Sequence, residues 1–317
     1  MSSQQEKLQF LQIHIDAARN ATDDFNAFHD PYKWNVIHSN PFGSTIALGF
    51  QLEALIESKI KQVRESNNET ALLAKHHLHF SNFHISFADV IRPNETFEIT
   101  IKSTANNIKN KAQIGNRVAI RKERRLVVMG YQRESQESLV FPEADFSAIG
   151  DLHTHNDREN IMNGRYFLKR KFMNTSNGKN FLAGSLVDQH LYFDELEDRV
   201  EFPGMFPAAL LSCALLEKIK QEGHDFYGKP MVYTQHAISI DRRHLSTLSS
   251  NDCLNMLIQG PETVSPEKGL GKSDIPQIAY NCFGLIHDNQ ILYRARVCMA
   301  LLEDIIATSR TSLVPHT

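Results

Sequence analysis

The sequence has 317 residues, of which 41% are hydrophobic and 22% charged, and its formal net charge is -3 at pH 7. This length accommodates about two domains of ~150 residues each, and the balance is that of an ordinary globular protein. A charge so close to zero gives no reason to expect a nucleic acid or a membrane surface as partner. The polar start MSSQQEKLQF lacks a secretory signal, and no apolar run reaches the ~18 residues that span a bilayer. We therefore expect a cytoplasmic protein without membrane insertion.

The cysteines indicate a reducing compartment. Cys213, Cys253, Cys282 and Cys298 lie far apart and without CxxC spacing. Such a pattern favours buried reduced thiols over a disulfide framework or a zinc site. We expect neither a metal nor a cofactor.

The first conspicuous segment is TDDFNAFHDP, residues 22–31. It places Asp24, Asn26, His29 and Asp30 within a few positions. Such residues cap helices and form turns, which is one interpretation of the segment. The other is a reaction centre, because a carboxylate and an imidazole that converge on one water can share general acid–base work.

A helix and several strands follow in chain order. Residues 41–60, PFGSTIALGFQLEALIESKI, form a long apolar stretch with a glycine-containing entry, which predicts a buried helix. Apolar residues alternate over residues 76–90, 96–104 and 116–132, between turns rich in Pro, Asn and charged residues. This alternation predicts antiparallel strands.

The same series occurs again after a mixed polar segment. Residues 134–164 show no clear period and predict a linker. Residues 202–221 predict a second buried helix, and strands are expected over residues 231–243, 253–260 and 280–302. We divide the chain into a first repeat (1–133), the linker (134–164), a second repeat (165–307) and a loose tail (308–317).

The repeat has a definite register. Gly43 and Gly204 lie 161 positions apart, and RKERR and HDNQ fall in matching hairpin turns. The same offset pairs Ala47 with Ala208, Leu55 with Leu216, His29 with His190 and Asp24 with Ser185. By this register the second repeat keeps the histidine and loses the acid, which predicts a degenerate copy.

Each half is thus one apolar helix followed by about four antiparallel strands. A curled sheet has one apolar face, and an apolar helix must be covered, so the sheet is expected to wrap the helix. This α+β order resembles the hotdog fold, and two copies in one chain resemble a double hotdog. The resemblance implies two sheets joined edge to edge in an internal pseudo-dimer; a homodimer of whole chains is a further expectation.

The resemblance is more specific over residues 22–50. MaoC-like, R-specific enoyl-CoA hydratases carry G-D-x-N-P-x-H, followed by a P-F-G-G-T-I-A-H-G-F helix entry. Residues 23–29, DDFNAFH, resemble the first motif, and residues 41–50, PFGSTIALGF, resemble the second. The chain departs from the pattern at Asp23 for Gly, Ala27 for Pro and Leu48 for His.

The family resemblance implies an acyl-thioester hydratase or dehydratase that interconverts trans-2-enoyl and R-3-hydroxyacyl thioesters. Asp24 and His29 would then be the acid–base pair, and Asn26 would orient it. The backbone N–H of Gly49 would bind the developing enolate oxygen at the helix N-terminus. The implied partner is an acyl chain carried on CoA or on an acyl carrier protein (ACP).

Two other functions use the same fold. In a hotdog thioesterase, Asp24 would direct water to the thioester carbonyl. In a non-catalytic acyl-binding protein, the fold would persist without turnover. Ser185 has His190 five residues away, but no nucleophile elbow surrounds it.

A second hotdog family supplies a competing site. Hydroxyacyl-ACP dehydratases use a His before an F-P-G turn and a Glu on the central helix. Phe202-Pro203-Gly204 reproduces the turn with Glu201 in place of the His, while His38 and Glu53 have nearly suitable spacing in the first half. His38 is therefore a lesser candidate.

The basic run RKERR has two interpretations. It is either a solvated hairpin turn or a site at which Arg121 and Arg124 hold a phosphate of CoA or ACP. Both arginines are therefore candidate substrate-binding residues.

Overall fold

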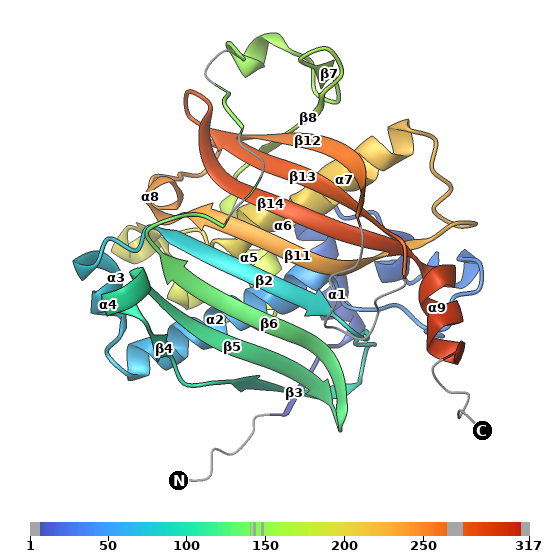
Figure 1. Ribbon diagram of the computed structural model, residues 1–317, viewed down its shortest axis with the longest axis horizontal. Helices are drawn as coiled ribbons and strands as arrows, with labels where there is room; N and C mark the ends of the chain where they lie inside the picture. Colours follow the sequence, from blue (N-terminus) through green and yellow to red (C-terminus); the bar gives the residue numbers. More distant parts are fainter. Residues whose placement is uncertain (1–6, 140, 142–143, 147–148, 265–274, 312–317) are drawn as a thin grey trace.

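The computed structural model of the chain describes residues 7–139, 141, 144–146, 149–264 and 275–311 (Figure 1). The helices are α1 (Gln12–Thr22), α2 (Gly49–Ser66), α3 (Thr70–Lys75), α4 (Ile108–Lys111), α5 (Thr175–Gly184), α6 (Met205–Ala209), α7 (Leu211–Gln221), α8 (Arg242–Leu245) and α9 (Leu302–Thr311). Short 3-10 helices are η1 (Ala27–His29), η2 (Trp34–Val36), η3 (Leu152–Thr154), η4 (Gln189–Leu191) and η5 (Glu195–Glu197).

The strands form one large antiparallel sheet and one small ribbon. In the first half they are β1 (Lys7–Gln9), β2 (Phe80–Phe87), β3 (Thr96–Ile101), β4 (Ala105–Asn106), β5 (Gln113–Lys122) and β6 (Arg125–Ser135). Those that follow are β7 (Asn160–Ile161), β8 (Tyr166–Phe172), β9 (Phe193–Asp194), β10 (Arg199–Val200), β11 (Met231–Asp241), β12 (Cys253–Val264), β13 (Gln277–Ile286) and β14 (Gln290–Leu301). The large sheet runs β1-β3-β5-β6-β2-β11-β14-β13-β12-β8-β7, with β4 beside β5, and the ribbon is β9-β10.

The two halves join at a single seam in the middle of this sheet. Strand β2 of the first half pairs antiparallel with β11 of the second, from Gln235 opposite Ser86 to Asp241 opposite Phe80. On either side, the hairpins β5-β6 and β13-β14 each carry a register shift near the turn. The predicted repeat, its strands and its edge-to-edge joint are therefore confirmed.

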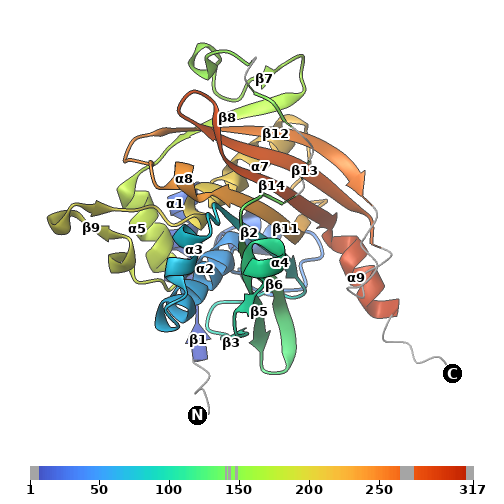
Figure 2. The same cartoon turned by 60° about the vertical axis from the view of Figure 1, so that its left-hand side comes forward.

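Helices α1, α2, α5, α6 and α7 pack on one face of the sheet. In Figure 1 they lie behind the strands, and the turned view of Figure 2 shows them stacked along one side. Helix α2 is buried over most of its first half and places Phe50, Leu55 and Ile60 in a core that also takes in Phe206 and Leu215 of the second half. One hydrophobic core therefore serves both repeats.

Helices α1 and α5 lie against each other and hold the two repeats together at a second place. A side chain at Gly184 would meet the backbone of α1, with Ala18 N at 2.6 Å and His14 O at 2.7 Å from an ideal Cβ. A glycine is required there because the two helices approach so closely. Neither helix was predicted from the sequence.

Part of the predicted linker packs on the outer face of the second repeat. Phe146, Leu152 and Ile161 form a small core with Leu168 and Phe283. Predicted linker residues 140, 142–143 and 147–148 lie outside the described residues, as do 312–317 of the predicted tail. Helix α9 continues to Thr311, past the predicted start of the tail. No helix within the described ranges is long and apolar enough to cross a membrane.

Candidate active site

The loop that carries the predicted residues follows directly from the end of α1. Asp23 adopts a left-handed conformation with φ 52°, and the N–H of Asp24 donates to the carbonyl of Arg19 at 2.9 Å, which closes the helix. Oδ1 of Asp24 then accepts from the N–H of Asn26 at 2.9 Å, and Oδ1 of Asn26 accepts from the N–H of Phe28 at 3.1 Å. The segment therefore builds its own turns, and η1 carries His29 into the interior.

Asp24 and His29 form a buried pair. Oδ2 of Asp24 lies 3.9 Å from Nε2 of His29, and the side chains are 2% and 6% exposed. This distance is too long for a direct hydrogen bond, but one oxygen atom can contact both groups. Nδ1 of His29 lies 2.8 Å from the carbonyl of Ile46. Because a carbonyl only accepts, this contact requires a proton on Nδ1 and leaves Nε2 of the neutral ring as a base.

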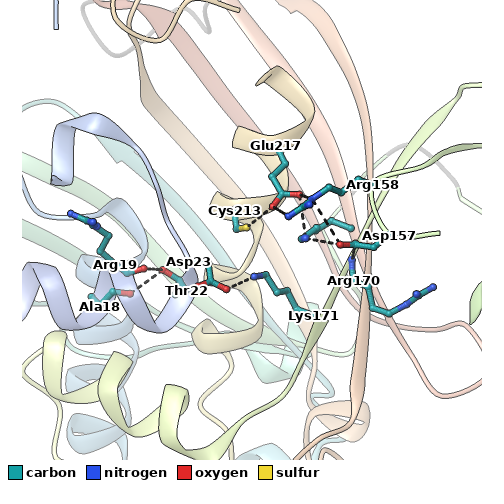
Figure 3. Close-up of polar contacts among 11 residues, drawn as sticks. Ala18, Arg19, Thr22, Asp23, Asp157, Arg158, Arg170, Lys171, Cys213 and Glu217 are labelled. Atoms are coloured by element: carbon teal, nitrogen blue, oxygen red, sulfur yellow. Dashed lines mark hydrogen bonds and ion pairs between the residues drawn. The ribbon is translucent and has the colours of Figure 1, made fainter. Parts of the chain in front are cut away.

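The other acids of the segment hold the loop in place. Asp30 pairs with Arg19 at 3.3 Å and with Lys33 at 3.8 Å. Asp23 pairs with Lys171 of β8, a contact across the two halves that Figure 3 shows beside α1. Asp24 is therefore the acid of this segment that faces the histidine.

Figure 3 also shows a cluster of charged residues from the linker and the second repeat near Asp23. Glu217 of α7 accepts from Arg158 at 2.6 Å, and Lys169 of β8 contacts both Glu217 and Asp157. Burial raises the pKa of the adjacent Cys213 thiol to about 12. The thiol therefore stays protonated and is not a nucleophile.

The amino end of α2 lies beside the pair. Gly49 is the first helical residue, a position at which the N–H has no carbonyl partner within an α-helix. Ile46 and Ala47 lead into it, held by bonds to the carbonyls of Phe28 (3.0 Å) and Ile91 (2.8 Å). The helix dipole favours negative charge at this end.

Next to these groups the structure forms a partly open cavity of about 490 Å³. His29, Asn26 and Gly49 line it from the first half. The second half supplies apolar walls from α7, β11 and β14, and α9 adds Leu302, Ile305 and Ile306. Its lining is mostly apolar, with Asp89, Arg92, Lys122 and Arg125 as the charged residues. His29 of the pair thus faces a cavity built by both repeats.

Four sequence candidates do not line the cavity. His38 is exposed and donates its main-chain N–H to the carbonyl of Tyr227 at 2.8 Å, whereas Glu53 is fully buried and pairs with His236. The proposed His38–Glu53 pair is therefore wrong. Arg121 and Arg124 are exposed and do not line the cavity; Lys122 and Arg125 of the same hairpin do.

Sequence reasoning missed the contribution of β11. Tyr233 lines the cavity, and His236 lies next to it with its Nδ1 3.1 Å from Oε2 of Glu53. Both members of the His236–Glu53 pair are 0% exposed. Because the two residues are separated by most of the chain, no local spacing could have revealed them; only the alignment of β11 against α2 does.

The second repeat has lost both members of the pair. Val187 bonds to Leu182 as Asp24 does to Arg19, and Leu191 bonds to Asp188 as His29 does to Asn26. Asp188 caps η4 as Asn26 caps η1. The ungapped register was thus wrong: Val187 and Leu191 replace Asp24 and His29, and His190, which is exposed, corresponds to Phe28.

The helix entry of the second repeat is also occupied. Oε1 of Glu57 accepts from the N–H of Gly204 at 3.0 Å, and Oε2 accepts from that of Met205 at 3.0 Å. Ser185 is buried, and its Oγ has no hydrogen-bond partner among the described residues. Among all the residues that the structure describes, no group of three His, Cys, Asp or Glu side chains could hold a metal ion.

No protein-family model matches the chain, and no curated protein matches it in sequence. Solved structures do match. A conserved hypothetical protein of Mycobacterium tuberculosis with a double hotdog fold superposes with a TM-score of 0.55 at 11% identity, over 94% of each chain. The protein has the double hotdog fold.

Two further solved structures that superpose on this chain are named as enzymes. A MaoC-like dehydratase aligns over 93% of this chain and 95% of its own, with a TM-score of 0.53 and 8% identity. The peroxisomal multifunctional enzyme type 2 of Drosophila melanogaster gives a TM-score of 0.51 at 9% identity, over 94% of this chain and 48% of that one. Identities this low establish the double hotdog architecture and leave the reaction to the site.

Proposed function

We propose that this double hotdog protein is an acyl-thioester hydratase or dehydratase, with Asp24 and His29 as its acid–base pair. The observation that carries the proposal is the geometry of these two side chains. They are buried, 3.9 Å apart, and the histidine lines the cavity next to the amino end of α2. A pair so placed can hold one water or hydroxyl group between a carboxylate and an imidazole.

The reaction adds water across the C2–C3 double bond of a trans-2-enoyl thioester. The water oxygen forms a bond to C3 as one of its protons passes to Nε2 of His29, whose other nitrogen is held by Ile46. The double-bond electrons move into the thioester, and C2 then takes a proton from the pair. Asp24 stabilises the imidazolium and orients the water. Dehydration runs through the same steps in reverse.

The developing enolate oxygen needs a fixed donor. Gly49 lines the cavity at the first position of α2, so its N–H and the helix dipole would stabilise negative charge on a thioester carbonyl bound there. The apolar walls exclude water, which strengthens these interactions. An acyl chain is the ligand that suits such walls.

The second repeat lacks the acid–base pair, so each chain has one site of this kind. It presents Val187 and Leu191 where the pair would stand, and Glu57 occupies its helix entry. We infer that the second half serves as the wall of the site in the first.

The charged residues of the cavity support a carrier with phosphate groups. Lys122 contacts Glu95 at 3.0 Å and Asp89 at 3.4 Å, so its charge is balanced, whereas Arg125 is exposed. A guanidinium binds phosphate through parallel hydrogen bonds. We therefore propose that Arg125 contacts the phosphates of CoA or ACP.

The test follows the loss of enoyl absorbance with crotonyl-CoA and with a longer trans-2-enoyl-CoA. We expect wild-type turnover to fall at least ~100-fold in Asp24→Asn and His29→Ala, as for loss of a general acid–base group. His190→Ala is the matched control, because this histidine lies in the corresponding 3-10 helix and is exposed. Its activity should equal that of the wild type.

The other functions give different results in the same experiment. Release of free thiol from saturated acyl-CoA, lost in Asp24→Asn, would identify a thioesterase. Tight binding of acyl-CoA without either product would identify an acyl-binding protein. Equal activity of the wild type and both pair variants would refute the assignment of the site.

A further inference from the structure

Tyr233 brings a hydroxyl group of the second half to the site of the first half. It lies on β11 and lines the cavity together with His29 and Gly49. Its hydroxyl lies 3.4 Å from Oγ of Ser212, near the limit of a hydrogen bond. That contact leaves the hydroxyl able to turn towards a ligand.

The hydroxyl of Tyr233 is in the protonated form that a hydrogen-bond donor requires. Burial, and after it the negative charge of Asp24, raise the pKa of Tyr233 far above its usual range. The group therefore keeps its proton at any physiological pH and can donate it in a hydrogen bond. Tyr233 and His29 of the acid–base pair line the same cavity.

The imidazole of His236 packs against the ring of Tyr233. Its ring centre is 4.7 Å from that of Tyr233 at an interplanar angle of 70°, and 4.6 Å from that of Phe50 in a stacked arrangement. Its Cε1 is 3.5 Å from the position a Cβ would take on Gly49. Tyr233 and Gly49 thus lie beside the same ring, and both line the cavity.

The position of this ring is set by Glu53 of α2. Nδ1 of His236 lies 3.1 and 3.2 Å from the two carboxylate oxygens, and both side chains are fully buried. Glu53 lies one turn after Gly49 on the same helix. The pair therefore links the amino end of α2 to β11 across the two halves. Nε2 of His236 has no hydrogen-bond partner within the described residues, so the ring is held from one side.

We propose that Tyr233 is a catalytic hydrogen-bond donor, which joins the N–H of Gly49 in binding the thioester oxygen, and that the His236–Glu53 pair positions it. This inference rests on the proposed function. In the reaction, the hydroxyl keeps its covalent proton and stabilises the enolate oxygen while C2 and C3 change. The second repeat, which has lost its own acid–base pair, thereby supplies part of the active site.

The experiment compares Tyr233→Phe with Tyr293→Phe. Both variants remove one tyrosine hydroxyl. The hydroxyl of Tyr293 is buried, has no hydrogen-bond partner among the described residues and does not line the cavity. Loss of one donor to an oxyanion lowers kcat by about 100- to 1000-fold. We expect at least the lower value for Tyr233→Phe with KM changed less than about 3-fold, and wild-type kinetics for Tyr293→Phe.

The positioning role is tested by a double-variant cycle with His236→Gln, which can keep a hydrogen bond to Glu53. If His236 acts through Tyr233, its effect on kcat disappears once the hydroxyl is gone, so Tyr233→Phe/His236→Gln should match Tyr233→Phe. An independent structural effect would add to that of Tyr233→Phe and would overturn the positioning role.

The outcomes separate the two proposals. Wild-type kcat in a folded Tyr233→Phe variant, with Asp24→Asn inactive, overturns the role of Tyr233 and leaves the proposed function standing. A wild-type protein that does not turn over enoyl thioesters at all overturns both.

Discussion

Replacing Glu57 by Gln should remove a specific part of the pH dependence of stability. Glu57 lies on α2, and its carboxylate accepts from the N–H groups of Gly204 and Met205. Burial raises its pKa from 4.5 to about 7, against these backbone hydrogen bonds, which lower it. The folded protein thus prefers the protonated form of this side chain.

The sign and size of the effect follow from linkage. Between the unfolded and the folded pKa, the folded state binds the extra proton, so stability is highest below 4.5 and falls as the pH rises to about 7. At about 1.36 kcal/mol per pH unit, the full shift corresponds to about 3 kcal/mol. The side chain is only half-buried, so contact with water reduces the loss to about 2 kcal/mol.

The assay is urea denaturation of the wild type and of Glu57→Gln at about pH 5 and about pH 8. Other groups titrate equally in both proteins, so the difference between the two pH dependences isolates Glu57. We expect the wild type to lose about 2 kcal/mol more than the variant between these pH values. Glu65→Gln, an exposed carboxylate on the same helix, should behave as the wild type. Equal pH dependence in all three proteins would refute the reasoning.

Two other substitutions have defined outcomes. Arg64→Met should destabilise the protein by about 3–5 kcal/mol in urea denaturation, because it leaves the buried Glu134, 2.7 Å from Arg64, without its charge partner. The control is Lys109→Met at an exposed position, which should change stability by less than about 0.5 kcal/mol. A loss of only that size in Arg64→Met would contradict the pairing. Arg125→Ala should raise KM for an enoyl-CoA about 10-fold at low salt and less at high salt, since screening weakens its contact with phosphate. The control is Arg117→Ala, an exposed arginine on the same hairpin, and an unchanged KM in Arg125→Ala would exclude this phosphate contact.

Much of the architecture could be predicted because it depends on local pattern. Alternating apolar residues marked β2, β3 and β11–β14, and the two apolar stretches marked α2 and α6–α7. Helices α1 and α5 were missed because their apolar stripes are narrow and they pack on each other, which no single segment reveals. The buried pair Asp24–His29 was predicted from spacing, since both residues lie on one short loop.

Other parts of the site depended on the exact register. The second loop has one residue fewer between its left-handed residue, Leu186, and the cap of η4 than the first has between Asp23 and Asn26. An ungapped comparison therefore paired His29 with His190 instead of Leu191. A register shift after Ile120 alters which basic residues of RKERR face the cavity, and it favours Lys122 and Arg125.

The sequence by itself determined the repeat, the order of helices and strands, and the loop that joins a carboxylate to an imidazole. These features depend on neighbours a few residues apart, whose spacing and polarity act through local geometry. The tertiary structure decided the rest: that β11 lies against α2, that His236 meets Glu53, and that Tyr233 lines the same cavity as His29 of the other repeat. Contacts between distant segments depend on how the two halves of the sheet align at the β2–β11 seam, and this alignment is set by the packing of one shared core.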